Sequence, residues 1–238
     1  MDTILSIIIP SYNNKTLLKE CLDSIYKKPF CNSCEVIVVD GGSEDGTREL
    51  LSLYSEEQPS LKYMSEVDSG IYNAMNKGIS ISKGRWLYFL GTDDQILTSV
   101  VDIIDIILGV KPNKKIIAGA VEYDDGSYFQ SYLNDDIFFK NTLHHQAMFY
   151  SREAIVEKGG FDESFRILGD FDLNQRIAIL DNHIQSSSIK LIDVLIAKCG
   201  SQGVSKTQMK LIRKERFRLI LNFRKYFVFK IKGRTWFC

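Results

Sequence analysis

Acidic side chains follow three short apolar segments of this sequence, directly where each segment ends. These acids are Asp40, the pair Glu66 and Asp68, and the pair Asp93 and Asp94. Carboxylates gathered at one place raise each other's pKa unless a cation or hydrogen-bond donors compensate. Mg²⁺ or Mn²⁺ would do so, because these hard cations take oxygen ligands and complete their shell with water and substrate phosphate. The pattern therefore indicates a site for a divalent cation and a phosphorylated ligand, provided that the fold brings the acids together.

Two of these motifs have an alternative interpretation when each is taken alone. The Asp93-Asp94 pair suits the metal role because it stands in a tight turn after Gly91, but both acids are also common turn formers and helix caps. Asp40 precedes a glycine pair, so it can accept from a base N–H or a ribose hydroxyl, or it can belong to an ordinary strand-to-helix turn. Neither motif, taken alone, decides between a ligand-binding role and a structural role in a turn.

The segments before these acids are predicted to be strands of one sheet. The predicted strands are 5–9, 35–39, 61–65 and 86–90. Helical segments lie between them and begin after Asn13 or Asn14, after Ser43 or Asp45, and at about Gly70. Strands that alternate with helices favour a mostly parallel sheet, whose ligands bind beyond the carboxyl ends of the strands. The acids, far apart in sequence, are therefore expected at one edge.

The pattern changes after about residue 110. Further strands are predicted at 115–121, 127–133 and 146–150, with a hairpin turn at 124–126 and a helix from Asp170 or Phe171 to Asp181. We interpret residues 1–203 as one α/β domain, with a nucleotide-binding half at 1–110 and a second half with a smaller mixed sheet at 111–203. Residues 204–238 form a basic tail.

Composition places the chain among ordinary globular proteins. Its 238 residues are 45% hydrophobic and 25% charged, which suits one large core and argues against disorder. The five cysteines are odd in number and scattered, and Cys31 and Cys34 form a lone C-x-x-C, so neither a disulfide framework nor a zinc ribbon is expected. No apolar run suits a signal peptide or reaches the roughly 20 residues of a membrane span, so we expect a cytoplasmic protein.

Taken in order, several segments resemble the inverting glycosyltransferases of family 2, which have the GT-A fold. The segments are Ile7-Ile-Ile-Pro-Ser-Tyr-Asn13, Val38-Val-Asp-Gly-Gly-Ser43, Glu66-Val-Asp-Ser-Gly-Ile-Tyr-Asn-Ala-Met-Asn-Lys-Gly-Ile79, Phe89-Leu-Gly-Thr-Asp-Asp94, His145-Gln146, Gly160-Phe-Asp-Glu163 and Gly169-Asp-Phe-Asp-Leu-Asn-Gln-Arg176. They cover about residues 3–180, and the ordered set is far more specific than any one member. The third segment is especially similar to bacterial transferases that build surface polysaccharides.

The resemblance implies a role for each matching position. The nucleotide would be held by Pro10, Tyr12, Asp40, Asp68 and Asp93. Asp94, in the region that matches the family's D-x-D motif, would be the direct ligand of a Mn²⁺ or Mg²⁺ ion that meets the diphosphate. Asp170 matches the acid that acts as catalytic base.

The sequence departs from the family at two of these motifs. Gly91 stands where the family often has Asp, so the metal motif is shortened, and Gly169 replaces a common Glu before the base. Asp172 is therefore a rival to Asp170, although at two residues further along a helix it should point elsewhere.

The segment His144-His145-Gln146 lies near the start of a predicted strand. By resemblance, His145 and Gln146 border the acceptor or diphosphate site; a structural role is the alternative, since strand ends need polar caps. Arg176 on the last predicted helix is expected to pair with a neighbouring acid rather than to contact substrate.

The expected reaction needs a base to take the proton of an acceptor hydroxyl, and stabilisation of a leaving diphosphate. We expect transfer of a sugar from a nucleotide-diphosphate sugar, with UDP the favoured carrier, to a hydroxyl of a lipid-linked saccharide in the biosynthesis of a bacterial surface polysaccharide such as O-antigen, capsule or exopolysaccharide. Two alternatives stay open. One is a nucleotidyltransferase that makes sugar nucleotides, although the segment 10–13 is not a Gly-rich basic phosphate loop; the other is a non-catalytic module that binds nucleotide sugars.

The tail is strongly basic, whereas the rest of the chain is acidic. Residues 204–238 carry eleven Lys or Arg and one acid, Glu215, whereas the other 203 residues carry 19 basic and 29 acidic groups. A basic, aromatic segment suits an anionic membrane surface, where each basic group adds about 1 kcal/mol. We expect peripheral attachment to the cytoplasmic face of the inner membrane; packing on the acidic body or an oligomer contact are the alternatives. Nucleic-acid binding is not expected, because no reader motif accompanies the charge.

Overall fold

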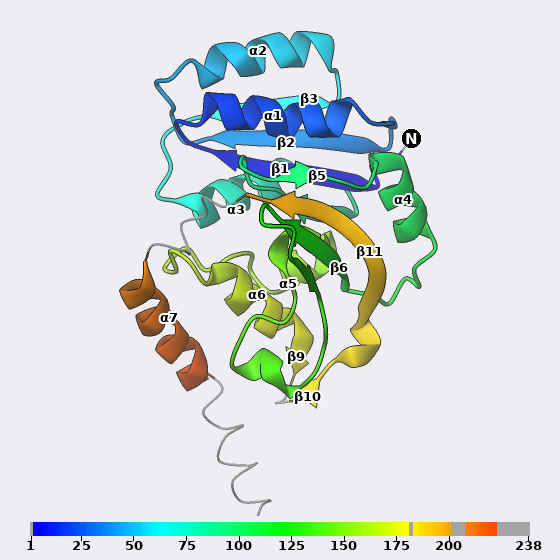
Figure 1. Ribbon diagram of the computed structural model, residues 1–238, viewed down its shortest axis with the longest axis vertical. Coiled ribbons are helices and arrows are strands. Elements are labelled where there is room, and N and C mark those ends of the chain that lie inside the picture. Colours follow the sequence, from blue (N-terminus) through cyan, green and yellow to red (C-terminus); the bar gives the residue numbers. More distant parts are fainter. Residues whose placement is uncertain (1, 181–182, 201–207, 223–238) are drawn as a thin grey trace, which may run out of the picture.

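The computed structural model describes residues 2–180, 183–200 and 208–222, and most of its strands belong to one large sheet (Figure 1). That sheet has nine strands, in the order β3-β2-β1-β4-β8-β6-β11-β5 with β7 paired to β6. The strands are β1 (Leu5–Ser11), β2 (Cys34–Asp40), β3 (Leu61–Ser65), β4 (Trp86–Phe89), β5 (Gln95–Ile96), β6 (Ile116–Tyr123), β7 (Tyr128–Gln130), β8 (Met148–Ser151) and β11 (Ile189–Cys199). The helices are α1 (Lys15–Tyr26), α2 (Thr47–Glu57), α3 (Ile71–Ile81), α4 (Val100–Leu108), α5 (Arg152–Glu157), α6 (Gly169–Ala178) and α7 (Met209–Asn222).

The first four strands are parallel, as the sequence predicts. β1 lies between β2 and β4, and its Leu5 stands beside Cys34 on one side and Trp86 on the other. Every residue of β1 and β2 is buried, because helices cover both faces of this part of the sheet. Ile7 packs in the cluster that includes α1 and α2, whereas Ile8 packs in the cluster that includes α3, as alternation along a strand requires. The carboxyl ends of the four strands therefore share one edge.

The strands of the second half continue the same sheet as its mixed part. β8 runs antiparallel to both β4 and β6, and β11 runs parallel to β6. The predicted strand 127–133 is shortened to β7, and the predicted strand 146–150 begins at Met148, after a 3₁₀ turn over His145–Ala147. The predicted hairpin turn is confirmed, because Gly126 adopts φ +79° between the antiparallel β6 and β7. Phe149 of β8 belongs to the same buried cluster as Ile7, so both halves share a core.

The helix α6 ends earlier than the sequence predicts. It stops at Ala178 rather than Asp181, because Ile179 and the residue after it form β9 (Ile179–Leu180), which pairs with β10 (His183–Ile184) as a separate two-stranded sheet. An extended pair cannot keep helical hydrogen bonds, so the pairing sets the end of the helix. Asp181 itself lies outside the described residues.

α1 begins after Asn14, as the sequence predicts, but long-range contacts take the polar groups at its start. The alternative in which Asp93 and Asp94 cap a helix is wrong, because the next two residues form β5 and α4 starts only at Val100. The side chain of Asn14 does not cap α1; it donates a 3.0 Å hydrogen bond to Thr92 Oγ1. The N–H of Lys15 is satisfied instead by Asp45, which comes from the loop after β2.

The described part of the basic tail is the helix α7. It lies at the side of the domain, next to the loop that leads into α6 (Figure 1). Its Leu219 is buried in the cluster that holds α3 and α6. Within the described ranges, no helix is long and apolar enough to cross a bilayer. The aromatic and basic residues at 223–238, which also belong to the predicted membrane segment, lie outside the described residues.

Candidate active site

The predicted nucleotide residues meet where the parallel strands end. The backbone of Gly41 lies so close to its neighbours that a Cβ there would approach Asp68 Oδ2 to 2.7 Å and the ring of Tyr12 to 3.3 Å. Tyr12 is 65% exposed, so its ring is available to a ligand, and Pro10 is buried in β1 beside Val39. Tyr12 and Asp68, 56 positions apart in sequence, thus flank one backbone segment after β2.

Asp40 forms the floor of this region rather than an open contact surface. Its side chain is 0% exposed. Oδ2 accepts from the N–H of Ser43 at 3.1 Å and from the hydroxyl of Ser65 at 2.7 Å, and Oδ1 accepts from the hydroxyl of Ser43. The carboxylate therefore ties the end of β2 to the end of β3 and holds the loop that carries Gly41.

Asp93 and Asp94 converge over the backbone of Gly91. A Cβ on Gly91 would lie 2.6 Å from Asp94 Oδ2 and 3.0 Å from Asp93 Oδ1, so a side chain there would displace the carboxylates from these positions. Asp94 is 3% exposed, and it accepts from the N–H groups of Gly91 at 3.0 Å and Gly200 at 3.1 Å. Burial and the charge of Asp93 raise the pKa of Asp94 to about 6.

This carboxylate pair fits a hard divalent cation such as Mg²⁺ or Mn²⁺. Two oxygen donors held side by side match the one or two carboxylates that Mg²⁺ takes, with water and phosphate completing the shell. Among the described residues, no group of three or more His, Cys, Asp or Glu could hold a metal, so an all-protein cage is not present in those ranges. A bound cation would also relieve the repulsion that raises the pKa of Asp94.

Asp170, the predicted base, stands in the first turn of α6 with two polar partners. Its Oδ2 accepts a 2.9 Å hydrogen bond from Asn141 Nδ2, and its Oδ1 lies 3.5 Å from the hydroxyl of Tyr72. Burial raises the pKa of Asp170 to about 6, and these donors oppose the rise. A carboxylate with such a pKa is ionised at neutral pH and can accept a proton there.

A buried polar network links Asp170 to the other side of the site. Asn174 donates to Asn141 at 3.0 Å and accepts from the hydroxyl of Tyr150 at 2.7 Å, and that hydroxyl lies 3.4 Å from His145 Nδ1. The next residue, Gln146, has a side chain that hydrogen-bonds Asp94. Asp170 and the carboxylate pair are thus joined by contiguous hydrogen-bonded groups and one step of backbone.

His145 is a core residue in this arrangement. Its ring stacks on Phe89 with centroids 5.5 Å apart, and burial lowers its pKa to about 3, so the ring is neutral. His144 is likewise held neutral by burial, which lowers its pKa to about 4. Gln146 is the member of this segment that reaches the acidic pair, through its side chain to Asp94.

The rival acid Asp172 points elsewhere, as helical geometry predicts. Its Oδ2 accepts from Arg176 Nε at 2.7 Å, and the guanidinium also donates to the carbonyls of Lys158 and Gly160. The predicted pairing of Arg176 with a neighbouring acid is confirmed. Asp172 therefore orients Arg176, whose guanidinium holds the loop at 158–160, and Asp172 shares no partner with Asp170 in these contacts.

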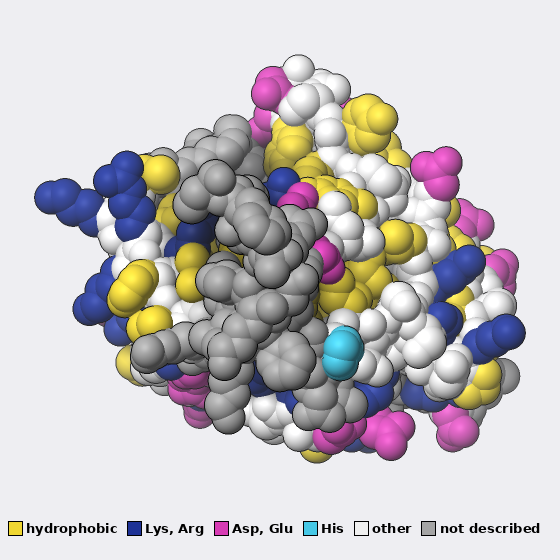
Figure 2. All heavy atoms as spheres, turned by 90° about the horizontal axis from the view of Figure 1, so that it is seen from below, with side chains coloured by type: hydrophobic (Ala, Val, Ile, Leu, Met, Phe, Trp, Pro, Cys, Tyr) yellow, Lys and Arg dark blue, Asp and Glu magenta, His cyan; other side chains and the backbone are white. Residues whose placement is uncertain are grey.

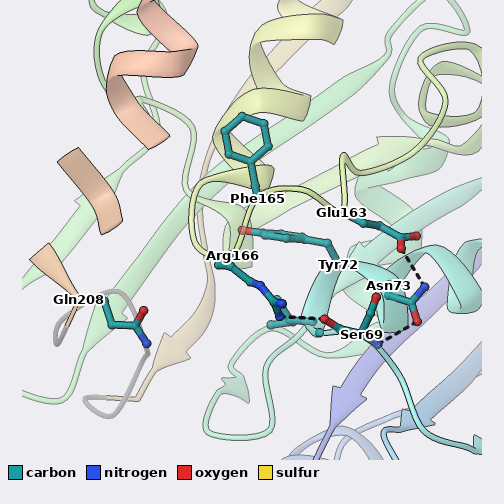
Figure 3. A pocket seen from close by; sticks show the side chains of 9 residues that line it. Ser69, Tyr72, Asn73, Glu163, Phe165, Arg166 and Gln208 are labelled. Carbon is teal, nitrogen blue, oxygen red and sulfur yellow. Dashed lines mark hydrogen bonds between the residues drawn. The ribbon is translucent and has the colours of Figure 1, made fainter. Parts of the chain in front are cut away.

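A cavity of about 390 Å³ is lined in part by Tyr72 (Figure 3), whose hydroxyl lies 3.5 Å from Asp170 Oδ1. Its lining is mixed, with Asn73 and Glu163 joined by a 2.9 Å hydrogen bond and Arg166 Nη1 donating to the carbonyl of Ser69 at 2.8 Å. Tyr72 belongs to both the cavity wall and the surroundings of Asp170, because its hydroxyl reaches that carboxylate. A space of this size and polarity suits part of a sugar or of an acceptor.

The sequence left Asn141 and Tyr72 out of the candidate site. Tyr72 lies within the segment 66–79, which resembles the family. A tyrosine can both pack and form hydrogen bonds, so its position in this segment could have indicated a role in the site. Asn141 stands in a segment without periodicity, 29 positions before Asp170, and nothing local in the sequence indicates its contact.

Comparison with known proteins identifies relatives of this chain. A family model described as glycosyl transferase family 2 matches residues 6–167. A PGL/p-HBAD biosynthesis glycosyltransferase of Mycobacterium bovis is 33% identical over 183 residues, which are 72% of this chain and 68% of that protein. The glycosyltransferase GlyG of Streptococcus pneumoniae is 25% identical over 155 residues, which are 62% of this chain and 51% of that protein.

Solved structures show the same fold at lower identity. TarS of S. aureus superposes with a TM-score of 0.69 at 17% identity, over 92% of this chain and 39% of that one. TarS 1–349 in complex with UDP-GlcNAc gives a TM-score of 0.67 at 18% identity, over 84% of this chain and 59% of that one. The mannosyltransferase PcManGT of Pyrobaculum calidifontis, in complex with GDP-Man and Mn²⁺, gives 0.64 at 19% identity, over 95% of this chain and 70% of that one. The fold is therefore that of the GT-A transferases, and the chain belongs to glycosyltransferase family 2.

Proposed function

We propose that this chain is an inverting, metal-dependent glycosyltransferase that moves a sugar from a nucleotide-diphosphate sugar, with UDP the favoured carrier, to a hydroxyl of a lipid-linked saccharide. The observation that carries the proposal is the pairing of two carboxylate sites. One is the Asp93–Asp94 pair at the carboxyl edge of the sheet, and the other is Asp170, with a polar network running between them. The first site would bind the cation and the diphosphate of the donor, and the second would take the proton of the acceptor hydroxyl.

In the proposed reaction, Asp170 takes the proton from the acceptor hydroxyl while that oxygen attacks the anomeric carbon. The bond from that carbon to the diphosphate oxygen breaks, the nucleotide diphosphate leaves, and the configuration at the carbon inverts. Asn141 holds one oxygen of the Asp170 carboxylate, so the other oxygen is left for the acceptor. Tyr72 limits the position of the carboxylate from the side of α3.

The donor is proposed to bind along the strand ends. Tyr12 would stack with the base and Asp68 would accept from the base or ribose, since both flank Gly41. Asp93 would lie on the nucleotide side and Asp94 would hold Mn²⁺ or Mg²⁺, which when bound supplies positive charge to the leaving diphosphate. Complexes of the neighbouring folds with UDP-GlcNAc, and with GDP-Man and Mn²⁺, support this class of ligand.

The acceptor is proposed to be lipid-linked and to belong to the biosynthesis of a bacterial surface polysaccharide such as O-antigen, capsule or exopolysaccharide. The bacterial glycosyltransferases that resemble this chain include one of PGL/p-HBAD biosynthesis. α7 adds physical support, because its outward face carries basic and apolar side chains together. That face consists of Lys210, Arg213, Lys214, Phe217 and Leu221, all exposed and spaced at helical intervals.

Figure 2 shows dark blue and yellow side chains interspersed at the side of the molecule that α7 occupies in Figure 1. A helix with this composition binds the surface of an anionic membrane, with its cations at the headgroups and its apolar side chains below them. We therefore propose peripheral attachment at the cytoplasmic face of the inner membrane.

A donor panel tests the proposal. UDP-glucose, UDP-galactose, UDP-GlcNAc and GDP-mannose are incubated with the full chain, with Mn²⁺ or with EDTA. Hydrolysis of the donor, in which water takes the place of the acceptor hydroxyl, is followed through release of the nucleotide diphosphate; thermal shifts with UDP and GDP run beside it. We expect Mn²⁺-dependent release from at least one donor and Mn²⁺-dependent stabilisation by its diphosphate. Stabilisation without any release would identify a binding module, and the absence of both would contradict the proposal.

A further inference from the structure

The carboxylate of Glu215 links the C-terminal helix to the loop that leads into the catalytic helix. Glu215 Oε1 accepts from the N–H of Arg166 at 2.7 Å, and Oε2 accepts from the N–H groups of Ile167 at 3.1 Å and Leu168 at 2.9 Å. The side chain is 5% exposed although its residue stands in an otherwise basic helix. One carboxylate thus satisfies three consecutive backbone donors.

These donors stand directly before the first turn of α6, where a helix leaves N–H groups without internal partners. Leu168 is the cap residue of α6, and its own side chain makes no capping bond. A negative charge at this end is favourable both as an acceptor and through the helix dipole. Glu215 of α7 therefore accepts from the N–H of the cap residue Leu168 and from those of the two residues before it, and it places a negative charge at the start of α6.

The same loop touches the surroundings of the base. The carbonyl of Ile167 accepts a 2.6 Å hydrogen bond from the hydroxyl of Tyr72, and that hydroxyl also accepts from the N–H of Asp170 at 3.4 Å. A shift of residues 166–168 would move Tyr72 and the start of α6 together. The contacts run without a break from Glu215 through Ile167 and Tyr72 to Asp170.

From this chain of contacts we infer that Glu215 is a positioning residue for Asp170, so that α7 is a working part of the active site as well as a candidate membrane helix. The inference rests on the proposed function. The helix lies beyond the residues 6–167 that match the family model, so the family match does not imply this role.

The matched variants are Glu215→Gln and Arg218→Gln. Gln keeps the size of the glutamate side chain but has one acceptor oxygen, and its NH₂ group would face the N–H groups of the loop. Arg218 also holds α7 to the body, through a 2.7 Å ion pair with Asp162 and a guanidinium 4.2 Å from the ring centroid of Phe165, yet it makes none of the bonds to the N–H groups of 166–168. Arg218→Gln therefore weakens the docking of α7 but keeps the hydrogen bonds between Glu215 and the N–H groups of 166–168.

Both variants and the wild type are assayed with whichever donor of the panel the wild type consumes fastest. We expect Glu215→Gln to lower kcat by about 10- to 100-fold, with the donor KM changed by less than about threefold, because the base is displaced while the nucleotide site stays intact. Arg218→Gln should keep kcat within about threefold. Hydrogen exchange of the amides at 166–168 should be faster in Glu215→Gln, and this readout holds even if thermal stability falls.

The outcomes distinguish a failure of this inference from a failure of the proposed function. Equal kcat losses in the two variants would mean that Glu215 only docks α7. An unchanged kcat in Glu215→Gln, despite faster exchange at 166–168, would overturn the inference and leave the proposed function in place. A wild-type chain that consumes no donor would contradict the proposed function itself.

Discussion

Asn141 donates a 2.9 Å hydrogen bond to the carboxylate of Asp170, from a loop 29 positions earlier in the chain. Asn141 also accepts from Asn174, which in turn accepts from Tyr150, so its amide is held in one orientation. A fixed donor on one carboxylate oxygen lowers the pKa of the base and aims its other oxygen. The relationship makes the behaviour of Asp170 testable through a second residue, Asn141.

Replacing Asn141 by Ala should weaken the base and shift its titration. Loss of a donor to a charged group costs about 1.5 to 3 kcal/mol, so the acid limb of the kcat profile should move upward by about one pH unit or more. Profiles from pH 4.5 to 9 for this variant and for the exposed control Asn113→Ala measure the effect. An acid limb at the wild-type position in Asn141→Ala would remove Asn141 from the account.

The wild-type profile should itself report Asp170. Because burial raises the pKa of this carboxyl to about 6, the base is protonated and inactive below that pH and ionised above it. We expect kcat/KM, which reports the free enzyme, to rise with pH through about 6 and then to level. A profile that is flat from pH 4.5 to 8 would exclude a base with the raised pKa.

Ionisation of Asp170 should also lower the free energy of unfolding of the protein. Its folded pKa lies above the usual value of 3.8, so the unfolded chain releases the proton first, and this group's contribution to stability falls as pH rises from about 4 to about 6. Asp170→Asn removes this cost and keeps an oxygen for Asn141. The thermal midpoint of the variant minus that of the wild type should therefore increase between pH 4 and pH 6.5; a difference that falls with pH would contradict the burial of the charge.

Much of this site follows from patterns that are local in sequence. The apolar runs that end at Asp40 and at Asp93-Asp94 form parallel strands, and the parallel order alone brings these acids to one edge. Local patterns do not predict the contacts of Asn141 and Glu215. Each contact joins residues that are 29 to 49 positions apart and depends on how a loop or α7 packs against α6. Hydrogen-bond partners of this kind leave no periodic signal.

The metal prediction is tested at the acidic pair. Asp93→Asn and Asp94→Asn each remove one charge from the proposed cation site, so calorimetric titration with UDP and Mn²⁺ should give affinities lower by about 10- to 100-fold or more. Without Mn²⁺, Asp94→Asn and the wild type should bind UDP similarly. Asp105→Asn, on the exposed side of α4, is the control and should bind as the wild type does. Mn²⁺-dependent binding that survives in both variants would place the cation elsewhere.

Membrane attachment is tested on the outward face of α7. Removing three charges with the combined changes Lys210→Gln, Arg213→Gln and Lys214→Gln should weaken binding to vesicles of phosphatidylglycerol and phosphatidylcholine by about 100-fold, from about 1 kcal/mol for each charge. The control carries Lys83→Gln, Lys111→Gln and Lys190→Gln, which are exposed and outside α7. Equal losses in the two triple variants would mean that overall charge, rather than α7, sets the attachment.

The central claim is that Asp170 is the base of a glycosyl transfer, and its direct test is the Asp170→Asn variant in the donor panel at pH 8. The carboxylate is replaced by an amide that keeps its shape and its bond to Asn141 but cannot take a proton. We predict that release of the nucleotide diphosphate from the donor falls by about 1,000-fold or more, while calorimetric binding of UDP with Mn²⁺ stays within about threefold of the wild type. Turnover near the wild-type rate in Asp170→Asn would contradict the account.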